Sequence, residues 1–571
     1  MPAAEVPATL AAAGTATSAE VLPGPAAAAA DRTSAAHDGG TGPAGRGLAD
    51  RPAKGWPAWR WAAGYLVAGA ALFFCYLRLS RTMGVTSDGA SNALQAWDML
   101  HGNWLLHGWT LSDVSFYTTE LPEYMVVELV RGLGPDVVHV AAAFTYTLLV
   151  LLAGLLAKGR ATGREGLVRI LIASGIMLAP QIGAGVFILL LSPDHVGTQV
   201  PLLAIWLLLD RAPRRWYVPV IAGLVLAWVE VADRLALTIG ALPLVVVCGV
   251  RAYRGVVQRR EPASSQWFEL SLGAAALVSA PVAGFAGRVL GRLGGYAVQP
   301  LATTFAGSAY WPAHLALTLE GLLGLYGADI SNQPLSVATA VILVHLAGLV
   351  LAGWAVSRAI RRFFRCDDLI AAVLTVAIVV NLIAYAFSVL PNSYWDTREI
   401  AAVLPLGAVL AGRLLAGPMI QARLLPALAA VLACYVLALG SGVAQPNPPA
   451  HDQYLAGWLA AHHLTVGLGS YAVGNSTTLD SGGNIQVRSV TWHRGALRAW
   501  AYESKSAWFD PRLHYADFVV TTRQDGRRFF IPYRRVIAAF GPPARTYHYR
   551  AHTIMIWNKN LLAGLPPSRW L

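Results

Sequence analysis

The sequence predicts a polytopic α-helical membrane protein with a small α/β domain at its C-terminus. The chain has 571 residues, of which 56% are hydrophobic and only 13% are charged, and its mean hydropathy is +0.50. Apolar runs recur at about the length that crosses a bilayer. The last of these runs ends near residue 442, and the chain beyond the Pro-rich linker at 445–449 contains none.

The apolar runs predict about eleven transmembrane helices. Their approximate limits are 62–79, 137–157, 167–190, 197–210, 216–232, 235–250, 267–289, 334–354, 367–390, 399–414 and 424–442. The runs at 197–210 and 216–232 are short for a bilayer, which indicates helices that are tilted, partly re-entrant or shielded by neighbours.

Basic residues predict the orientation in the plasma membrane. They gather between the apolar runs at 158–164, 211–215, 251–260 and 358–365. Short loops rich in Lys and Arg face the cytoplasm, which explains the formal charge of +12 without a nucleic-acid partner. A basic, aromatic collar at 51–61 keeps the N-terminus inside. An odd number of spans then places the C-terminal domain outside the cell.

Composition divides the chain into three regions. Residues 1–50, rich in Ala, Gly, Thr and Pro, are expected to be a disordered cytoplasmic tail. Residues 51–444 form the transmembrane domain, and 445–571 form an external soluble α/β domain. In that domain 518–520 and 553–557 resemble strands, and 451–463 resembles a helix.

Three further surfaces are expected outside the membrane. A long loop at about 80–136 suits amphipathic helices along the interface, and one at about 290–333 suits a half-buried interfacial loop. The C-terminal domain has 14 Lys and Arg against 6 Asp and Glu, a net charge of +8. That excess fits contact with anionic lipid or an anionic cell-surface polymer, or a solvated basic surface.

Ionisable residues gather where the apolar runs would meet the outer membrane face. They are Asp88, Asp194, His195, Glu230, Asp233, Arg234, Asp396 and Arg398. Charge beside hydrocarbon is costly, so a repeated cluster on one side indicates a binding or reaction site.

Asp88 and Arg398 are the strongest candidates. Asp88 follows the first span in the sequence Thr-Ser-Asp-Gly, where a partly desolvated carboxylate could accept a proton from a substrate hydroxyl. The alternative is a helix N-cap. Arg398 opens a late span, where a guanidinium can fork onto a phosphate while Trp395 packs against lipid or sugar. The alternative is a snorkelling arginine paired with Asp396.

The remaining candidates have weaker local signals. Asp194 and His195 occupy a tight turn, where they could hold a sugar hydroxyl, assist acid–base chemistry or supply two metal ligands, although a Pro-Asp turn also explains them. Asp233 and Arg234, near Glu230, lie in a hairpin that internal salt bridges would explain.

Other catalytic signatures are missing from the sequence. Its four cysteines are far apart and lack metal-ligand spacing, so no metal site is predicted, although a divalent cation at the external cluster stays open. The sequence has no phosphate-binding loop ending in Gly-Lys-Ser/Thr, no Gly-x-Ser-x-Gly and no His-Glu-x-x-His. A reaction driven by a cytoplasmic nucleotide is therefore not expected.

Taken together, these features resemble the GT-C superfamily of membrane glycosyltransferases, which includes protein O-mannosyltransferases and aminoarabinose transferases. The resemblance covers about 60–442, and it rests on the acid opening the first external loop, the arginine opening a late span and the exported terminal domain. Segments 467–472 and 556–562 resemble the tails of actinobacterial membrane proteins of this kind.

The resemblance implies transfer of a hexosyl or pentosyl group from a polyprenyl-phosphate-linked donor to a glycan, lipid or protein acceptor of the cell envelope, with inversion. It maps the first-loop acid onto Asp88 and the donor-phosphate arginine onto Arg398. Gly89 follows Asp88 where many members have a second acid, which weakens the case for a paired-carboxylate or metal site.

Two alternatives stay open at this point. A lipid or polysaccharide transporter would also have many spans and an external domain, but such proteins commonly show internal repeats and polar groups near the midplane. A non-catalytic scaffold of the same fold could bind cell-wall polymer through its exported domain.

Overall fold

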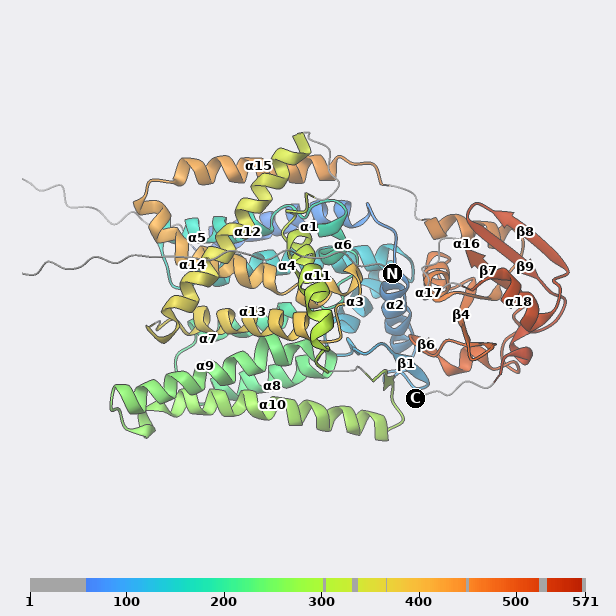
Figure 1. The fold of residues 1–571 in the computed structure, drawn as a ribbon, viewed down its shortest axis with the longest axis horizontal. Coiled ribbons are helices and arrows are strands. Elements are labelled where there is room, and N and C mark those ends of the chain that lie inside the picture. Colours follow the sequence, from blue (N-terminus) through green and yellow to red (C-terminus); the bar gives the residue numbers. More distant parts are fainter. Residues whose placement is uncertain are drawn as a thin grey trace, which may run out of the picture. The chain divides into compact units, whose positions relative to one another are not determined.

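The computed structural model describes residues 58–300, 304–330, 337–365, 367–447, 451–522 and 531–566. The predicted tail at 1–50 lies outside these residues. Within them, eight helices are long and apolar enough to cross a membrane, and Figure 1 shows most of them running side by side. The prediction of a helical, multi-pass membrane protein is confirmed.

The eight long helices agree with eight of the predicted spans. They are α1 (Ala58–Ser80), α4 (Asp136–Lys158), α9 (Leu242–Tyr253) with flanking π-helical turns that extend it over Leu237–Gln258, α10 (Trp267–Arg292), α12 (Val337–Arg362), α13 (Leu369–Phe387), α14 (Val403–Gln421) and α15 (Leu425–Val443).

The other three predicted spans are shorter helices. They are α5 (Gly163–Met177), α7 (Gln199–Arg211) and α8 (Tyr217–Ala232). The predicted span at 167–190 is interrupted, because α5 ends at Met177 and a separate short helix, α6 (Ala184–Leu189), follows. Pro180 has no N–H to donate to a helix, and Gly183 adopts a φ of +88°, so the chain turns between α5 and α6.

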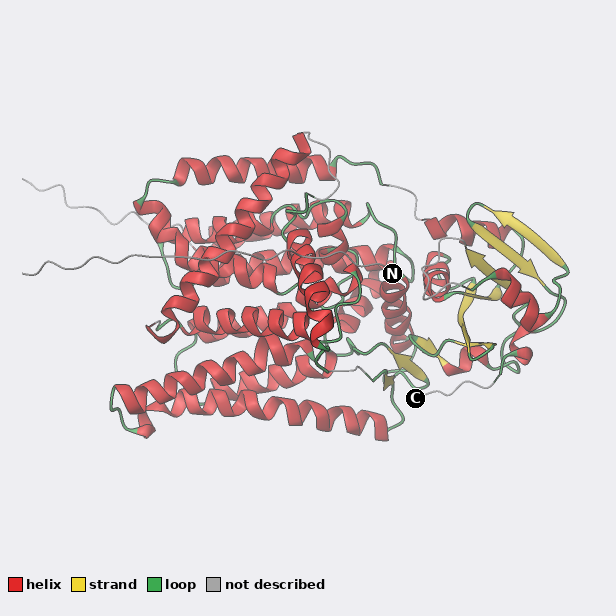
Figure 2. Ribbon diagram, viewed as in Figure 1, coloured by secondary structure: helices red, strands yellow, loops and turns green. Residues whose placement is uncertain are grey.

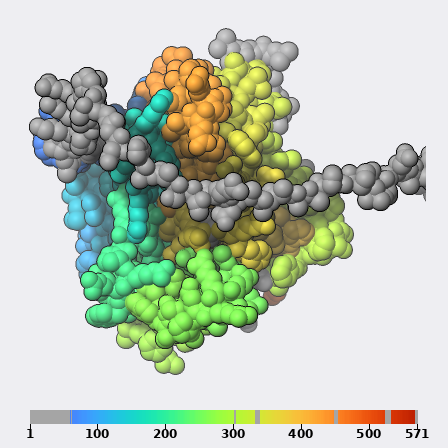
Figure 3. Space-filling model, turned by 90° about the vertical axis from the view of Figure 1, so that its left-hand side faces the viewer, coloured from blue at the N-terminus to red at the C-terminus, as the bar shows by residue number. Residues whose placement is uncertain are grey.

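Small residues let the central helices approach closely. A Cβ added at Gly412 of α14 would lie 2.6 Å from the carbonyl oxygen of Arg169 in α5 and 2.9 Å from the Cβ of Ala157 in α4. Helices that pack without a strong hydrophobic driving force commonly use such positions. A second group consists of α8, α9 and α10, which lie together in the green part of Figure 3.

The segment between α1 and α4 contains α2 (Ser87–Leu100), β1 (Trp109–Leu111) and α3 (Glu120–Arg131). The amphipathic helices predicted for this loop are present as α2 and α3, but α2 does not lie open on an interface. Ten of its fourteen residues are buried, because α2 packs against α3, α4 and α17 (Tyr471–Asp480) of the C-terminal region. Its Ala, Ser and Gly side chains fit these close contacts.

A three-stranded sheet joins distant parts of the chain. Its order is β2-β1-β6, in which β2 is Ala297–Val298 and β6 is Ser504–Lys505. β1 pairs in parallel with β2 and antiparallel with β6. The predicted interfacial loop at 290–333 thus supplies a strand, and it also contains helix α11 (Trp311–Leu325). The sheet fixes the C-terminal region, residues 451–566, against the loop after α2.

The C-terminal region contains a six-stranded mixed sheet, drawn in yellow in Figure 2. The strand order is β5 (Ala496–Ala499), β4 (Gln486–His493), β3 (Val466–Gly469), β7 (Phe518–Thr522), β9 (His552–Ile556) and β8 (Arg545–Tyr549), and the helices are α16 (His451–Ala461), α17 and α18 (Tyr533–Phe540). The predicted strands and helix are confirmed.

The sheet of the C-terminal region has two apolar faces. Along β7, Val519 packs in one core, and its neighbours Phe518 and Val520 pack in the other, as the two-residue period of a strand requires. The parallel strand β3 ends at Gly469 and α17 begins at Tyr471. This short connection places the first turn of α17 at the carboxyl end of the central strand β3. From there α17 packs against α2.

Candidate active site

The first turn of α2 presents Asp88. Thr86 is the N-cap of this helix, and its side chain accepts a hydrogen bond from the N–H of Gly89. The alternative interpretation of Asp88 as the cap is therefore wrong. Asp88 lies in the first turn instead, where the helix dipole favours a carboxylate and both carboxylate oxygens can reach other elements.

Arg398 lies on a 3-10 turn, Tyr394–Ile400, that precedes α14. Its Nη2 donates to Oδ2 of Asp88 at 2.9 Å, and its Nη1 lies 3.5 Å from Oδ2 of Asp194. Although burial opposes the charged form, these two carboxylates raise the pKa of Arg398 further above its ordinary value. A fully ionised guanidinium thus bridges two acids from different parts of the chain.

Asp396 does not pair with Arg398. Its Oδ2 accepts hydrogen bonds from the backbone N–H groups of Asn392 (3.0 Å) and Ser393 (2.8 Å), which completes a capping box for the 3-10 turn. Asp396 therefore shapes the turn that carries Arg398, and the snorkelling pair considered above is not formed.

Both carboxylate oxygens of Asp194 accept hydrogen bonds from neighbouring side chains. Its Oδ1 accepts from Nδ2 of Asn92 on α2 at 2.8 Å, and its Oδ2 accepts from Oγ of Ser192 at 2.8 Å. Burial raises the pKa of Asp194, while the charge of Arg398 opposes that rise. The Pro-Asp turn between α6 and α7 thus delivers a buried carboxylate to the guanidinium.

His195 forms the centre of a second cluster. Its Nδ1 lies 2.9 Å from Oδ2 of Asp233, and its Nε2 lies 3.5 Å from Oε1 of Glu399. Burial disfavours the imidazolium, but Glu399 and Asp233 outweigh it and raise the pKa of His195 to about 10. His195 also has a φ of +61°, an uncommon conformation for a side-chain-bearing residue, and such conformations concentrate at functional sites.

Glu120 lies behind this histidine cluster and is fully buried. Its Oε1 accepts from the N–H of Thr198 at 2.9 Å, and Thr198 Oγ1 contacts Oδ2 of Asp233 at 3.0 Å. Burial raises the pKa of Glu120 to about 8. Glu120 is therefore protonated at neutral pH and adds no charge to a site already rich in carboxylates.

The C-terminal region contributes Tyr471 and Glu503 to the site. The hydroxyl of Tyr471 donates to Oδ1 of Asp88 at 2.6 Å and also contacts Oε2 of Glu503. Ser87 Oγ donates to the carbonyl oxygen of Tyr471. Hydrogen bonds thus connect the start of α17 and the turn at Glu503, just before β6, with the first turn of α2.

The single proton of the Tyr471 hydroxyl limits how Asp88 and Glu503 can both contact it. A phenol has one proton, so Tyr471 can donate to only one of the two carboxyl groups that flank it. Burial and the nearby charge of Asp88 raise the pKa of Glu503 well above its ordinary value. This shift favours the protonated form of Glu503, which can donate to Tyr471 and leave the tyrosine proton directed at Asp88.

Of the sequence-predicted site residues, Asp88, Arg398, Asp194, His195 and Asp233 are brought together. Trp395 lies beside them, with Arg398 Cζ 5.9 Å from its ring centroid. Two others lie elsewhere. Glu230 accepts from Ser279 Oγ on α10 at 2.7 Å, and Arg234 is exposed, outside the ion pairs found among the described residues.

Sequence reasoning missed five members of the site. They are Asn92, Glu120, Glu399, Tyr471 and Glu503. Glu399 follows Arg398 directly in the sequence. Its position next to a candidate phosphate-binding cation could have marked it as a candidate site residue. Tyr471 and Glu503 lie in a region read as a separate soluble domain, and no local pattern links them to Asp88.

The donor set does not fit a divalent cation in this arrangement. Both oxygens of Asp88 and both of Asp194 already accept hydrogen bonds, and the guanidinium of Arg398 occupies the place between them. Among the described residues, no group of three or more His, Cys, Asp or Glu side chains could hold a metal ion. The arrangement therefore supports no step through a metal.

Comparison with known proteins finds similarity among solved structures. No protein-family model matches the chain, and no curated protein matches it. The crystal structure of the Archaeoglobus fulgidus oligosaccharyltransferase, in complex with Zn and sulfate, is similar at 14% sequence identity with a TM-score of 0.45. The similarity covers 80% of this chain and 67% of that chain. A likeness of this degree carries no conclusion about fold, activity or ligands.

Stability should depend on pH through Glu120. Burial raises the pKa of Glu120 from 4.5 to about 8, so between these values the folded protein binds more protons than the unfolded chain. The free energy of unfolding therefore falls as pH rises through this window, by up to about 1.4 kcal/mol per pH unit. Glu120→Gln keeps an acceptor oxygen but cannot ionise. In thermal unfolding of the solubilised protein, this variant should show a smaller decrease in melting temperature from about pH 5 to 8.

Glu165→Gln is the matched control. Glu165 forms a partly exposed ion pair with Arg169, so this change should leave the slope as in the wild type. An unchanged slope in Glu120→Gln would show that Glu120 takes up no proton on folding.

Proposed function

We propose that this protein is a GT-C-type membrane glycosyltransferase that transfers a sugar from a polyprenyl-phosphate-linked donor to an acceptor of the cell envelope. One observation carries the proposal. Asp88 and Arg398, 310 positions apart in the sequence, meet at 2.9 Å where α1 has ended and α14 is about to begin. A base and a phosphate-binding cation are the two groups that this transfer needs.

The distribution of charge supports an outward-facing site. The Asp88 end of the helices is also the end where Arg81 pairs with Asp136 at the start of α4. At the other end of α4, Arg413 donates to the carbonyl oxygen of Leu156 and pairs with Asp210. The short basic loops near 158–164 and 211–215 lie at that second end. It faces the cytoplasm by the positive-inside rule, and the C-terminal region then lies outside.

The Asp88–Arg398 ion pair gives the site a mode of activation. Without donor, Arg398 holds one oxygen of Asp88. A donor phosphate bound at Arg398 competes for the same Nη2, because bidentate binding of phosphate uses both terminal nitrogens. Asp88 Oδ2 is then free to face an acceptor hydroxyl, so the base is exposed when the donor is in place.

The transfer proceeds as a direct displacement. Asp88 takes the proton of the acceptor hydroxyl while the acceptor oxygen bonds to the anomeric carbon. The bond from that carbon to the phosphate oxygen breaks on the opposite face, and polyprenyl phosphate leaves with its charge stabilised by Arg398. The anomeric configuration inverts, and the sugar is a hexosyl or pentosyl group.

Neighbouring groups suit the remaining parts of the donor. The imidazolium of His195 is surrounded by carboxylates, and this cluster can hold sugar hydroxyls. Trp395 and Phe187 stack edge to face at 4.5 Å beside Arg398, and Trp395 is 48% exposed. An exposed indole next to the phosphate-binding arginine suits the first apolar units of the lipid chain.

The same geometry separates the proposal from its alternatives. A transporter typically places its polar groups near the bilayer midplane, whereas the Asp88–Arg398 network lies beyond the last residue of α1 and before the first of α14. A non-catalytic scaffold has no need for a base whose two oxygens are positioned by an arginine and a tyrosine from different parts of the chain. Turnover measurements on variants of these residues distinguish the three.

Asp88→Asn should abolish transfer. Loss of the base should lower kcat by at least about 100-fold. The melting temperature should fall only moderately, because Asp194 still pairs with Arg398 and the amide oxygen can still accept from Tyr471. The assay follows a radiolabelled polyprenyl-phosphate sugar with purified protein. Asp136→Asn, which removes an acid that pairs with Arg81 at the same end of the helices, is the control. Normal turnover by Asp88→Asn would refute the catalytic role.

Arg398→Ala should chiefly weaken the use of the donor. Loss of a charged hydrogen-bond donor to phosphate should raise KM for the lipid-linked sugar by about 10-fold or more. Arg131→Ala serves as the control, because Arg131 is half-exposed and pairs with Asp136 outside the site. A donor KM equal in all three proteins would remove Arg398 from the phosphate site.

Tyr471→Phe should slow the reaction through Asp88. The carboxylate loses the hydrogen bond that orients it, so kcat should fall about tenfold while KM for the lipid-linked donor stays near that of the wild type. Tyr515→Phe removes an exposed hydroxyl of the same region and should change neither quantity. A kcat equal to that of the wild type would show that Tyr471 does not act on Asp88.

A further inference from the structure

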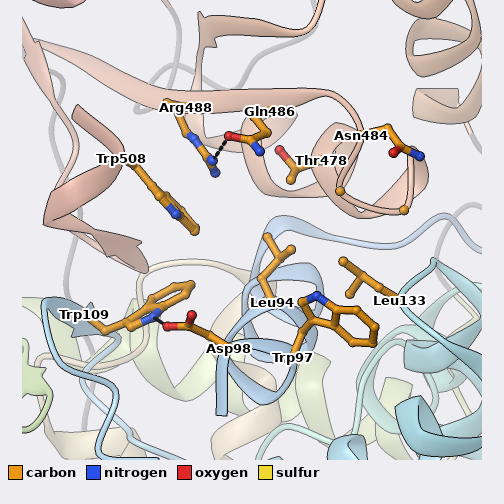
Figure 4. A pocket seen from close by; sticks show the side chains of 12 residues that line it. Leu94, Trp97, Asp98, Trp109, Leu133, Thr478, Asn484, Gln486, Arg488 and Trp508 are labelled. Atoms are coloured by element: carbon orange, nitrogen blue, oxygen red, sulfur yellow. Dashed lines mark hydrogen bonds between the residues drawn. The ribbon is translucent and has the colours of Figure 1, made fainter. Parts of the chain in front are cut away.

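A cavity lies between α2 and the C-terminal region. It has a volume of about 280 Å³, close to the lower end of the range for small-molecule sites. Figure 4 shows Trp97, Asp98 and Trp109 on its α2 and β1 side, with Arg488, Gln486 and Trp508 facing them from the C-terminal region. The size suits a single sugar residue better than a lipid chain.

Aromatic rings dominate the walls. Trp109 and Trp508 meet edge to face with centroids 4.8 Å apart, and Trp97 lies on the other side of Leu94 in Figure 4. Thr478 and Asn484 add polar groups to the rim. Indole faces next to hydrogen-bonding side chains match a sugar ring, which has apolar C–H faces and a rim of hydroxyls.

Arg488 gives the cavity an uncompensated positive charge. The residue is only 4% exposed, and its guanidinium lies 3.9 Å from the ring centroid of Trp508. Its Nη2 donates to the side-chain oxygen of Gln486, a neutral group, and its Nε has no hydrogen-bond partner. Among the described residues, no carboxylate forms an ion pair with it. Burial lowers the pKa of Arg488 to about 9, which still leaves it charged at neutral pH.

The one carboxylate of the cavity is already neutralised. Asp98 pairs with Lys505 at 2.9 Å and accepts from Trp109 Nε1 at 2.7 Å. It therefore cannot serve as the counterion of Arg488. A buried cation without a counterion is costly, and an anionic group of a ligand would offset that cost.

Three elements connect the cavity with the candidate active site. Helix α2 runs from Asp88 to Asp98, about 15 Å at 1.5 Å per residue. Helix α17 runs from Tyr471 to Thr478, about 10 Å along its axis. The strand that begins after Glu503 reaches Lys505, which pairs with Asp98. A glycan whose end lies at Asp88 can therefore place a later residue in the cavity.

We infer that this cavity binds an anionic saccharide, with the sugar ring against the tryptophans and its carboxylate or phosphate group at Arg488. The inference rests on the proposed function only in taking this saccharide to be part of the acceptor.

Calorimetry on the full-length protein in detergent tests the inference without donor or turnover. Three probes of equal length are compared: a neutral glucose oligosaccharide, one with a terminal glucuronic acid and one with a terminal sugar phosphate. At least one anionic probe should bind about tenfold more tightly than the neutral one. The two anionic arms show whether the cavity takes carboxylate or phosphate.

Arg488→Gln should remove most of this preference while leaving neutral binding within about twofold. Arg512→Gln is the matched control, because Arg512 is an 87% exposed arginine of the same region that pairs with Asp510. Arg488→Lys keeps the charge and should retain part of the preference if Arg488→Gln fails to fold.

Several outcomes would overturn the inference. Equal binding of all three probes to the wild type would do so, as would an undiminished preference in Arg488→Gln or an equal loss in Arg512→Gln. Binding should persist in Asp88→Asn, which lacks the proposed base. The proposed transfer can therefore fail while the saccharide site stands, and the reverse also holds.

Discussion

The ion pair between Asp88 and Arg398 is the constraint on which the site depends. Its partners come from the first turn of α2 and from a 3-10 turn before α14, so both turns must be placed to within a hydrogen-bond length. Arg398 is 11% exposed at its side chain, and a buried cation without partners would be strongly destabilising. Asp194 and Ser192 share the guanidinium, which ties the turn between α6 and α7 to the same point.

The surrounding carboxyl groups are tolerated because several of them hold protons. Arg398 and His195 are the cations at the centre of the site. Six carboxyl groups surround them: those of Asp88, Asp194, Asp233, Glu120, Glu399 and Glu503. Burial raises the pKa of Glu120 to about 8 and that of Glu503 well above its ordinary range. Both shifts favour the protonated form, in which these acids act as hydrogen-bonding groups. The negative charge then concentrates on the carboxylates that contact Arg398 and His195.

The sequence was most informative where an energetic rule acts locally. Long apolar runs predicted the spans, and charge at their ends selected Asp88, Asp194, His195, Asp233 and Arg398. It was less informative where the outcome depends on packing between distant segments. The predicted span at 167–190 is interrupted at 178–183 because of Pro180 and Gly183, two residues inside an otherwise apolar run. Tyr471 meets Asp88 across 383 positions, and that contact depends on the packing of α17 against α2 and on the pairing of β1 with β6.

The pairing of β1 with β6 also helps to hold the C-terminal region against α2. α2 is rich in Ala, Ser and Gly, so α17 can pack closely on it. β6 pairs antiparallel with β1, with Lys505 opposite Trp109. The same contacts position Tyr471 at one end of α2 and Arg488 near the other. A substrate that entered along α2 would therefore meet, in order, a buried cation flanked by tryptophans and a carboxylate held between a tyrosine and an arginine. Recognition and reaction would then depend on one interface, because any shift of α17 on α2 would move both.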